Sequence, residues 1–304
     1  MLLRAVLAVA VTGLAAVGCS SPGPAGSAGP AGSAGAPSAG APSGSRPATG
    51  IAAIPTPAHT LIVMLENHSF VQVIGNPAAP FINSVARRGA LFTNAHAVTH
   101  PSQPNYLALF SGSTQGVTDD GCPQRFDAPN LAAELSAAHD TFAGYSEGLP
   151  AAGWQVCSAG EYARKHVPWS DFSDVPGSAS QPFAAFPARD YTRLPTVSFV
   201  IPDLCHDMHD CPVAAADEWL AAHIGPYAGW AMTHHSLLIV AWDENDGSPG
   251  NQIPLIFAGE MVRPGHFSQP VTHYSVLATI ESAYGLPRIG QSAGTAPITG
   301  IWFS

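Results

Sequence analysis

Apolar residues gather in four short runs along the chain, at residues 60–65, 196–201, 236–242 and 253–258. The runs are rich in Val, Ile, Leu and Phe, and none contains a charged residue. Uninterrupted apolar runs of this length are typical of strands that are buried on both faces. The pattern therefore predicts four buried strands.

The stretches between these runs have helical character. Helices are expected at residues 80–88, 105–111, 130–138, 213–223 and 273–284, and Gly285 and Pro287 end the last of them. Strands that alternate with helices usually form a parallel sheet with helices packed on its faces. We therefore expect an α/β fold in which a largely parallel central sheet is sandwiched by helices.

The N-terminus has the layout of an export signal, with Arg4, an apolar run from Ala5 to Val17, and then Gly18 and Cys19. The apolar run is too short for a transmembrane helix. Residues 16–19, Ala-Val-Gly-Cys, resemble the bacterial lipobox. We therefore predict a signal peptide of the lipoprotein type over residues 1–19, with an ordinary secretory signal as the alternative. Both place the protein outside the cytoplasm, and a lipid on Cys19 is the expected link to a membrane.

Residues 20–50 consist almost wholly of Gly, Ala, Ser and Pro. Such a segment cannot bury enough apolar surface to offset the entropy that it would lose on ordering. We predict a disordered tether over residues 20–50, followed by a single folded domain over residues 51–304, which has an ordinary size for an α/β domain.

The charge of the chain argues against a nucleic acid as its main partner. The formal net charge is -10, with only 11 Lys and Arg residues. A nucleic-acid backbone is neutralised by clustered basic side chains. A small phosphorylated molecule stays open as a substrate, because metal ions or His side chains can supply positive charge locally.

Four cysteines remain when Cys19 is set aside, and an even number in an exported protein favours two disulfides. Cys205 and Cys211 are close enough in sequence to close one loop, which leaves Cys122 with Cys157. The other pairings stay open. A zinc site is the rival interpretation, but the chain has no C-x-x-C pair to support it.

Polar residues directly follow three of the predicted strands. They are Glu66, Asn67 and His68 after the first, Asp203, His206, Asp207, His209 and Asp210 after the second, and Asp243 and Glu244 after the third. The carboxyl ends of parallel strands meet at one edge of a sheet, where ligands bind. Carboxylates gathered there repel one another unless a cation binds between them. Any single cluster is explained as well by helix or turn capping, but three clusters together favour a metal site.

Ser102 lies between the first two clusters, just before an expected helix. A helix N-terminus stabilises an oxyanion and a bound phosphate. A Ser hydroxyl bound to a divalent metal loses its proton more easily and can then attack phosphorus. Taken alone, the segment favours a plain N-cap at Ser102.

Residues 65–70, Leu-Glu-Asn-His-Ser-Phe, resemble the E-N-[RH]-S-F signature of a bacterial phosphoesterase family. That family includes acid phosphatases and phospholipases C and belongs to the alkaline-phosphatase-like superfamily. Residues 100–109 are similar to its nucleophile segment, and their Ser-x-Pro-Asn core is similar to the Thr-x-Pro-Asn turn of nucleotide pyrophosphatases. Further blocks similar to the family follow in order at residues 162–169, 202–210, 242–244, 273–281 and 284–287.

The resemblance implies that Glu66, Asn67, Asp243 and Glu244 bind a divalent metal together with the Ser102 hydroxyl. It also implies that Ser102 forms a phosphoserine intermediate. Oxygen ligands of this kind point to Mg, Ca, Mn or Zn.

A second metal is held in the wider superfamily by an Asp, a nearby His and a late His. The matching residues here are Asp203, His206 or His209, and His273, and Asp210 is a further candidate for a metal or phosphate contact. This sequence departs from the two-metal pattern in its Asp-to-His spacing. It also has Asn67 where a two-metal enzyme would favour an ionised ligand.

Three histidines in the matched blocks are instead candidates for catalysis. His166, His206 and His209 suit contacts to phosphate oxygens or protonation of the leaving group, since an imidazole has a pKa of about 6.5. The expected function is metal-dependent hydrolysis of phosphate monoesters, as in acid phosphatases, favoured because the chain lacks an added C-terminal lipid-binding region. Phospholipase C or another phosphodiesterase is the rival activity. A non-catalytic surface-binding lipoprotein is the alternative from another class.

Overall fold

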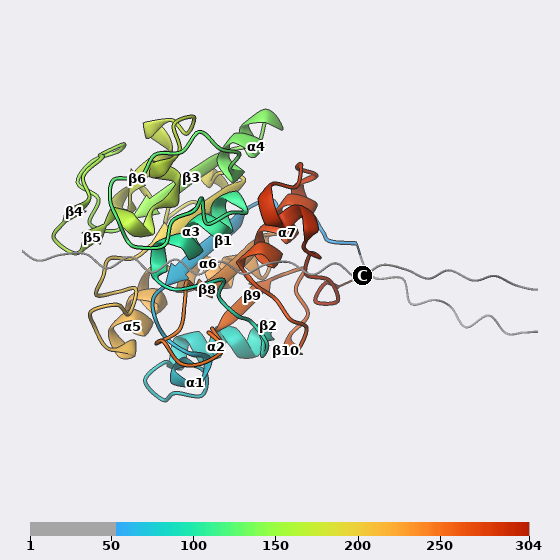
Figure 1. Ribbon diagram of the computed structural model, residues 1–304. Coiled ribbons are helices and arrows are strands. Elements are labelled where there is room, and N and C mark those ends of the chain that lie inside the picture. The colour runs from blue at the N-terminus through green and yellow to red at the C-terminus, as the bar shows by residue number, and fades with distance from the viewer. Residues whose placement is uncertain (1–52, 304) are drawn as a thin grey trace, which may run out of the picture. The chain divides into compact units, whose positions relative to one another are not determined.

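An eight-stranded sheet forms the centre of the computed structural model, which describes residues 53–303 (Figure 1). The strand order is β10-β2-β9-β8-β1-β7-β3-β6. In chain order the strands are β1 (Thr60–Leu65), β2 (Ala90–Phe92), β3 (Phe142–Ser146), β6 (Ser180–Pro182), β7 (Val197–Ile201), β8 (Leu237–Trp242), β9 (Leu255–Gly259) and β10 (Gly265–Phe267). A separate two-stranded ribbon consists of β4 (Ser158–Ala159) and β5 (Tyr162–Ala163). The predicted signal peptide with Cys19 and the whole of the predicted tether lie outside the described residues.

The sheet is largely parallel, as predicted. Strand β9 runs antiparallel to its neighbours β8 and β2, and the other adjacent strands run parallel to one another. Every residue of β1, β7 and β8 is buried, because these strands lie in the middle of the sheet under helices on both faces. The carboxyl ends of β1, β3, β7 and β8 therefore meet at the same edge.

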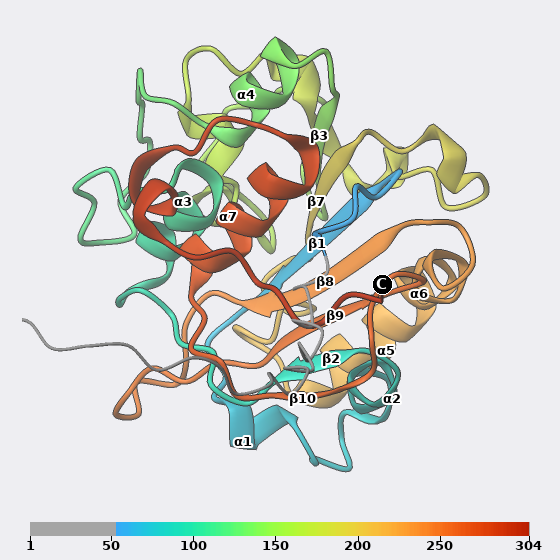
Figure 2. The ribbon, with the colours of Figure 1, turned by 90° about the vertical axis from the view of Figure 1, so that its right-hand side faces the viewer.

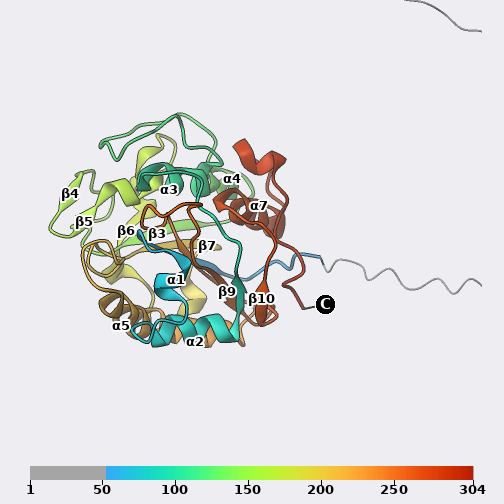
Figure 3. The same cartoon turned by 60° about the horizontal axis from the view of Figure 1, so that its bottom comes forward.

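Helices cover both faces of the sheet. One layer contains α2 (Pro80–Arg88), α5 (Val213–His223) and α6 (Gly225–Ala231), and the other contains α3 (Ser102–Ser111), α4 (Leu131–Ala137) and α7 (His273–Tyr284) (Figures 1 and 2). Figure 3 shows α3 and α7 above the sheet and α2 and α5 below it. The short helix α1 (Phe70–Val73) follows β1. None of the helices in residues 53–303 is long and apolar enough to cross a membrane.

The predicted strands and helices are all present, with ends shifted by a few residues at most. The largest shift concerns α3, which begins at Ser102 and not at Asn105. Strands β2, β3, β6 and β10 and helix α6 were not predicted, because they are short or interrupted by Gly and Pro. In β3, for example, Gly144 weakens the strand pattern, but a Cβ at this position would lie 2.1 Å from the ring of Trp169.

The two disulfides are Cys122–Cys157 and Cys205–Cys211, which confirms the favoured pairing. They close loops of very different size, with sequence separations of 35 and 6 residues. The first joins the segment after α3 to the β4 ribbon, and the second closes the turn between β7 and α5.

Replacing both Cys122 and Cys157 by Ala is expected to lower the free energy of unfolding by about 4 kcal/mol, because the unfolded chain regains the entropy of a long loop. The matched variant without Cys205 and Cys211 should lose only about 2 kcal/mol, since its loop is short. Urea denaturation of both variants measures the difference. An equal loss in the two variants would contradict the loop-size argument.

Candidate active site

The side chains that follow β1 and β8 meet the first residue of α3. Ser102 Oγ lies 2.9 Å from Glu66 Oε2, and 3.3 Å from both Asn67 Oδ1 and Glu244 Oε1. Ser102 is buried and is the first residue of the helix, with Pro101 at the N-cap position. Because Pro101 holds the N-cap position and the Ser102 hydroxyl donates to side-chain oxygens, the plain N-cap interpretation is wrong. The hydroxyl is aimed at oxygen atoms from two neighbouring strands.

Backbone geometry at the end of β1 helps to place these oxygens. Asn67 has a φ of 35°, in the left-handed region that Asn tolerates better than most residues. Its backbone N–H donates to Asp243 Oδ1 over 3.2 Å, which ties the end of β1 to the end of β8. The turn therefore holds Asn67 in contact with both Asp243 and the Ser102 hydroxyl.

The donor set fits a divalent cation. Asp243 is fully buried, and its Oδ2 has no hydrogen-bond partner in the described part of the chain. Burial and the charge of Glu244 raise the pKa of Asp243 well above its usual value. Burial also raises the pKa of Glu66, with further contributions from the charges of Asp243 and Asp207. Crowded, buried carboxylates with an unpartnered oxygen are the environment that a bound cation stabilises.

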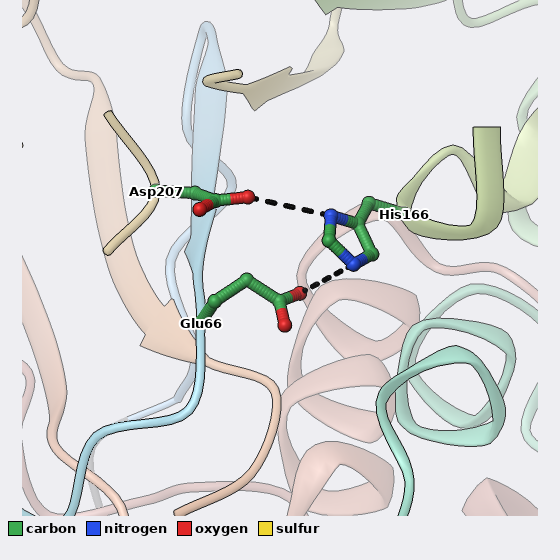
Figure 4. A group of neighbouring side chains, drawn as sticks. All are labelled: Glu66, His166 and Asp207. Atoms are coloured by element: carbon green, nitrogen blue, oxygen red, sulfur yellow. Dashed lines mark ion pairs between the residues drawn. The ribbon is translucent and has the colours of Figure 1, made fainter. Parts of the chain in front are cut away.

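A second group of buried side chains adjoins Glu66 (Figure 4). His166 Nε2 lies 3.2 Å from Glu66 Oε1, and His166 Nδ1 lies 3.3 Å from Asp207 Oδ2. Tyr106 of α3 stacks on the His166 ring, with centroids 5.1 Å apart, and its hydroxyl donates to Glu66 Oε1. Burial lowers the pKa of His166 well below its usual value and raises that of Asp207 to about 8. Glu66 therefore links Ser102 to this buried group.

The other predicted residues lie in separate contacts. His206 Nδ1 lies 3.0 Å from both Asp203 Oδ1 and Glu147 Oε2. These three residues form a group of possible metal ligands that is separate from the oxygens around Ser102. His209 pairs with Asp210 over 2.7 Å, and its ring lies 6.0 Å from that of His166.

His273 contacts neither of these groups directly. Its Nε2 lies 2.9 Å from the backbone oxygen of Trp242, directly before Asp243. Burial lowers the pKa of His273 to about 4. The structure thus places Asp203, Asp210 and His273 in three different contacts and not around a shared point.

Further polar contacts flank Ser102 and the residue that follows it. His100 pairs with Glu244, whose carboxylate also faces Ser102. On the other side, Asp120 Oδ1 accepts the backbone N–H of Gln103 over 3.0 Å, and Asp120 Oδ2 pairs with Lys165 Nζ over 3.0 Å.

The metal-free protein is expected to lose stability as the pH rises from about 6.5 to about 8. Glu66, Asp207 and Asp243 have raised pKa values when folded, so the folded state keeps protons that the unfolded chain has released, and a rise in pH favours unfolding. Below about pH 6.5 the lowered pKa values of His166 and His273 act in the opposite direction. Melting temperatures measured over this range, with a chelator and with added metal, test the expectation. A loss of the same size in both conditions would contradict it, because a bound cation should replace the protons.

Most of the folded part of the chain matches a known protein family. The profile of the family described as Phosphoesterase family matches residues 76–287. The chain belongs to the phosphoesterase family. The predicted membership of a phosphoesterase family is thereby confirmed, and this phosphoesterase is a hydrolase of phosphoric esters.

Curated relatives of this phosphoesterase are named phosphatases. It is 55% identical over 260 residues to a phosphatidylinositol-3-phosphatase from Mycobacterium tuberculosis, an alignment that covers 84% of this chain and 87% of that protein. It is 30% identical over 250 residues to a phosphate-repressible acid phosphatase from Penicillium chrysogenum, with 75% of this chain and 59% of that enzyme covered. The chain thus spans about three-fifths of the length of this fungal relative.

Solved structures similar to this phosphoesterase share its fold. One is a protein of the alkaline phosphatase superfamily from Vibrio parahaemolyticus, with a TM-score of 0.56, 13% identity, and 80% of this chain and 72% of that chain covered. Another is the lipoteichoic acid synthase of Listeria monocytogenes, with a TM-score of 0.56, 13% identity, and coverages of 80% and 77%. These likenesses confirm the predicted alkaline-phosphatase-like fold.

Several residues of the phosphoesterase site were not predicted as site residues. Asp207 belongs to a cluster recognised in the sequence, but nothing in the pattern distinguished it from its acidic neighbours. Nothing in the sequence marked Tyr106 or Glu147 as a site residue. Tyr106 fits the pattern of an apolar helix residue, and Glu147 follows strand β3, which was not predicted. Lys165 was identified only as part of a matched block.

Proposed function

We propose that the protein is a metal-dependent phosphatase that hydrolyses phosphate monoesters through a phosphoserine at Ser102. The observation that carries the proposal is the position of Ser102 Oγ, within 3.3 Å of oxygens from Glu66, Asn67 and Glu244. A serine hydroxyl at a helix start that faces carboxylates instead of capping the helix suits a nucleophile beside a cation.

Glu66, Asn67, Asp243 and Glu244 would hold the cation together with the Ser102 hydroxyl. When bound there, a divalent cation supplies positive charge that lowers the pKa of the hydroxyl and offsets charge on the phosphoryl oxygens. The unpartnered Oδ2 of Asp243 supports this assignment. The metal is drawn from Mg, Ca, Mn and Zn, which all accept oxygen ligands.

Ser102 Oγ attacks phosphorus in line with the bond to the leaving alcohol, and the alcohol departs as the phosphoserine forms. Glu66 Oε2, 2.9 Å away, is the nearest acceptor for the hydroxyl proton. His209 and His206 are partly exposed and can protonate the departing alcohol, whereas the buried His166 orients Glu66. Water then hydrolyses the phosphoserine and releases inorganic phosphate.

The substrate class is tested with p-nitrophenyl phosphate, its bis ester, phosphatidylcholine, and phosphatidylinositol 3-phosphate, the last because of the name of the 55% identical relative. We expect turnover of the two monoesters and little turnover of the other two. Faster hydrolysis of phosphatidylcholine or of the bis ester would favour phospholipase C or another phosphodiesterase. A purified, metal-loaded protein that hydrolyses none of them would favour the non-catalytic binding protein.

We further propose that the protein is exported. The two disulfides support this location, since disulfides persist in oxidising compartments. Residues 1–19 would be the signal and Cys19 the lipid-modified residue. A Cys19→Ala variant that remains attached to cells as firmly as the parent protein would argue against the lipid anchor.

A further inference from the structure

The ion pair between Asp120 and Lys165 adjoins the nucleophile but has no role in the cation site or in the transfer of the phosphoryl group proposed above. Lys165 Nζ lies 3.0 Å from Asp120 Oδ2, and Asp120 Oδ1 accepts the backbone N–H of Gln103 over 3.0 Å. Gln103 directly follows Ser102. Two hydrogen bonds therefore connect the ammonium group to the residue after the nucleophile.

A second path fixes Lys165 beside the site. It precedes His166, and both belong to the 3₁₀ helix η1 (Arg164–His166). Because the imidazole of His166 lies 3.2 Å from Glu66 Oε1, the backbone at Lys165 is held against the cation site. The ammonium group is thus held by two elements, through the hydrogen bonds to α3 and through the backbone of η1.

The pair is also accessible, unlike its neighbours. The side chains of Lys165 and Asp120 are 21% and 30% exposed, whereas those of Arg164 and Asp171 are 6% and 1% exposed. Arg164 is paired with Asp171 over 3.0 Å and cannot reach a substrate. Lys165 is the single lysine of the chain, as the other ten of the 11 basic residues are arginines.

The charge of the proposed substrate explains why a lysine would be useful at this position. A phosphate monoester carries between one and a half and two negative charges near neutral pH, roughly twice the charge of a diester. It must enter a site that already contains the carboxylates of Glu66, Asp243 and Glu244, in a chain of net charge -10. An ammonium group fixed through Asp120 to the residue after Ser102 offsets the repulsion that a dianion meets, and this effect is smaller for a monoanion.

We propose that Lys165 binds a non-bridging oxygen of the substrate's phosphoryl group and thereby selects dianionic monoesters over diesters. Asp120 is the positioning residue that holds the ammonium group beside Ser102. This inference rests on the proposed function. The carboxylate of Asp120 accepts a backbone N–H at the start of α3, a position that suits an anion. Asp120 therefore keeps Lys165 in position when no substrate is bound.

The test replaces Lys165 by Met, which removes the charge and keeps the length of the side chain. We expect kcat/KM for p-nitrophenyl phosphate to fall about 100-fold, the scale of losing one charged contact to a reacting group. The kcat/KM for the bis ester should change far less, so the ratio of kcat/KM for the monoester to that for the bis ester should fall. The Ki of inorganic phosphate as a competitive inhibitor should rise in parallel. Metal content should stay at the parent level.

Three variants separate this role from a structural one. Arg263→Met removes the same charge before β10, at the opposite edge of the sheet, and should change neither the substrate preference nor the Ki of phosphate. Asp120→Asn should raise KM for the monoester and the Ki of phosphate more than it lowers kcat. Lys165→Arg should restore part of the preference for the monoester.

A Lys165→Met variant that loses activity equally on both esters, or that binds inorganic phosphate as tightly as the parent, would overturn the inference. A different result would contradict the proposed function: the parent protein itself would prefer the bis ester or hydrolyse neither ester. In that case calorimetric titration of the metal-loaded parent and of the Lys165→Met protein with inorganic phosphate still decides whether Lys165 binds phosphate. Equal affinities would reject the contact, and a weaker variant would support it.

Discussion

Replacing Ser102 by Ala is expected to lower kcat for p-nitrophenyl phosphate by about 10⁴-fold or more, the scale observed when a covalent nucleophile is removed from a hydrolase. In the proposed mechanism the variant loses the Oγ atom that bonds to phosphorus, and water cannot occupy the same place with the same orientation. Its fold should be unchanged, because Pro101 and not Ser102 is the N-cap of α3. Its metal content should also persist, since the remaining proposed ligands directly follow β1 and β8.

Ser111→Ala is the matched control for this variant. Ser111 is the last residue of the same helix and is equally buried, but its hydroxyl donates to the backbone oxygen of Leu107, far from the carboxylates. The control should retain kcat. Acid quenching of the parent during turnover, followed by mass spectrometry, should find phosphate on the peptide that contains Ser102. Activity retained by Ser102→Ala, or phosphate on another residue, would remove Ser102 from the mechanism.

Replacing Asp243 by Asn is expected to remove the bound cation and to lower activity by more than about 100-fold, since even changes outside the ligand set can cost 10- to 100-fold in metal affinity. The metal-free variant should nevertheless be more stable than the metal-free parent at neutral pH. The metal-free parent must keep a proton on this buried carboxyl group, because its Oδ2 has no partner and Glu244 repels its ionised form, and the amide removes that requirement. The increase in melting temperature that added metal gives the parent should therefore vanish in the variant.

Asp217→Asn controls for the loss of a buried carboxylate as such. Both oxygens of Asp217 accept backbone N–H groups, those of Phe81 and Ile82 at the start of α2, away from the site. This control should lower stability and leave metal binding intact. Elemental analysis and thermal unfolding of both variants measure the contrast. Full metal content in Asp243→Asn would exclude Asp243 as a ligand.

The fold could be predicted from the sequence because its central strands are continuous apolar runs. Strands β1, β7 and β8 are buried on both faces, so that every position had to be apolar or small, and the runs identified them directly. Strand β3 could not be identified in this way. Its Gly144 is explained only by the ring of Trp169, which packs against it from a distant part of the sequence.

The same distinction applies to the site. Glu66 and Asp243 became candidates because each directly follows a predicted strand, a position that local sequence marks. Ser102 was distinguished from a plain N-cap only by the resemblance of residues 100–109 to the family's nucleophile segment. Their assembly around the hydroxyl is what the structure adds. Contacts between side chains from unrelated segments leave no local pattern, and the interaction of Tyr106 with Glu66 and the pair of Asp120 with Lys165 are of this kind.

The tie between Asn67 and Asp243 also bears on how the chain acquires activity during folding. These residues are 176 positions apart, and they meet only when β1 and β8 pair in the register that sets Leu65 opposite Trp242. Pairings of such high sequence separation form slowly, because the intervening chain must first be brought together. The onset of catalysis in a refolding experiment should therefore report the joining of these two strands, and fragments that end before residue 237 should be inert however well their helices form.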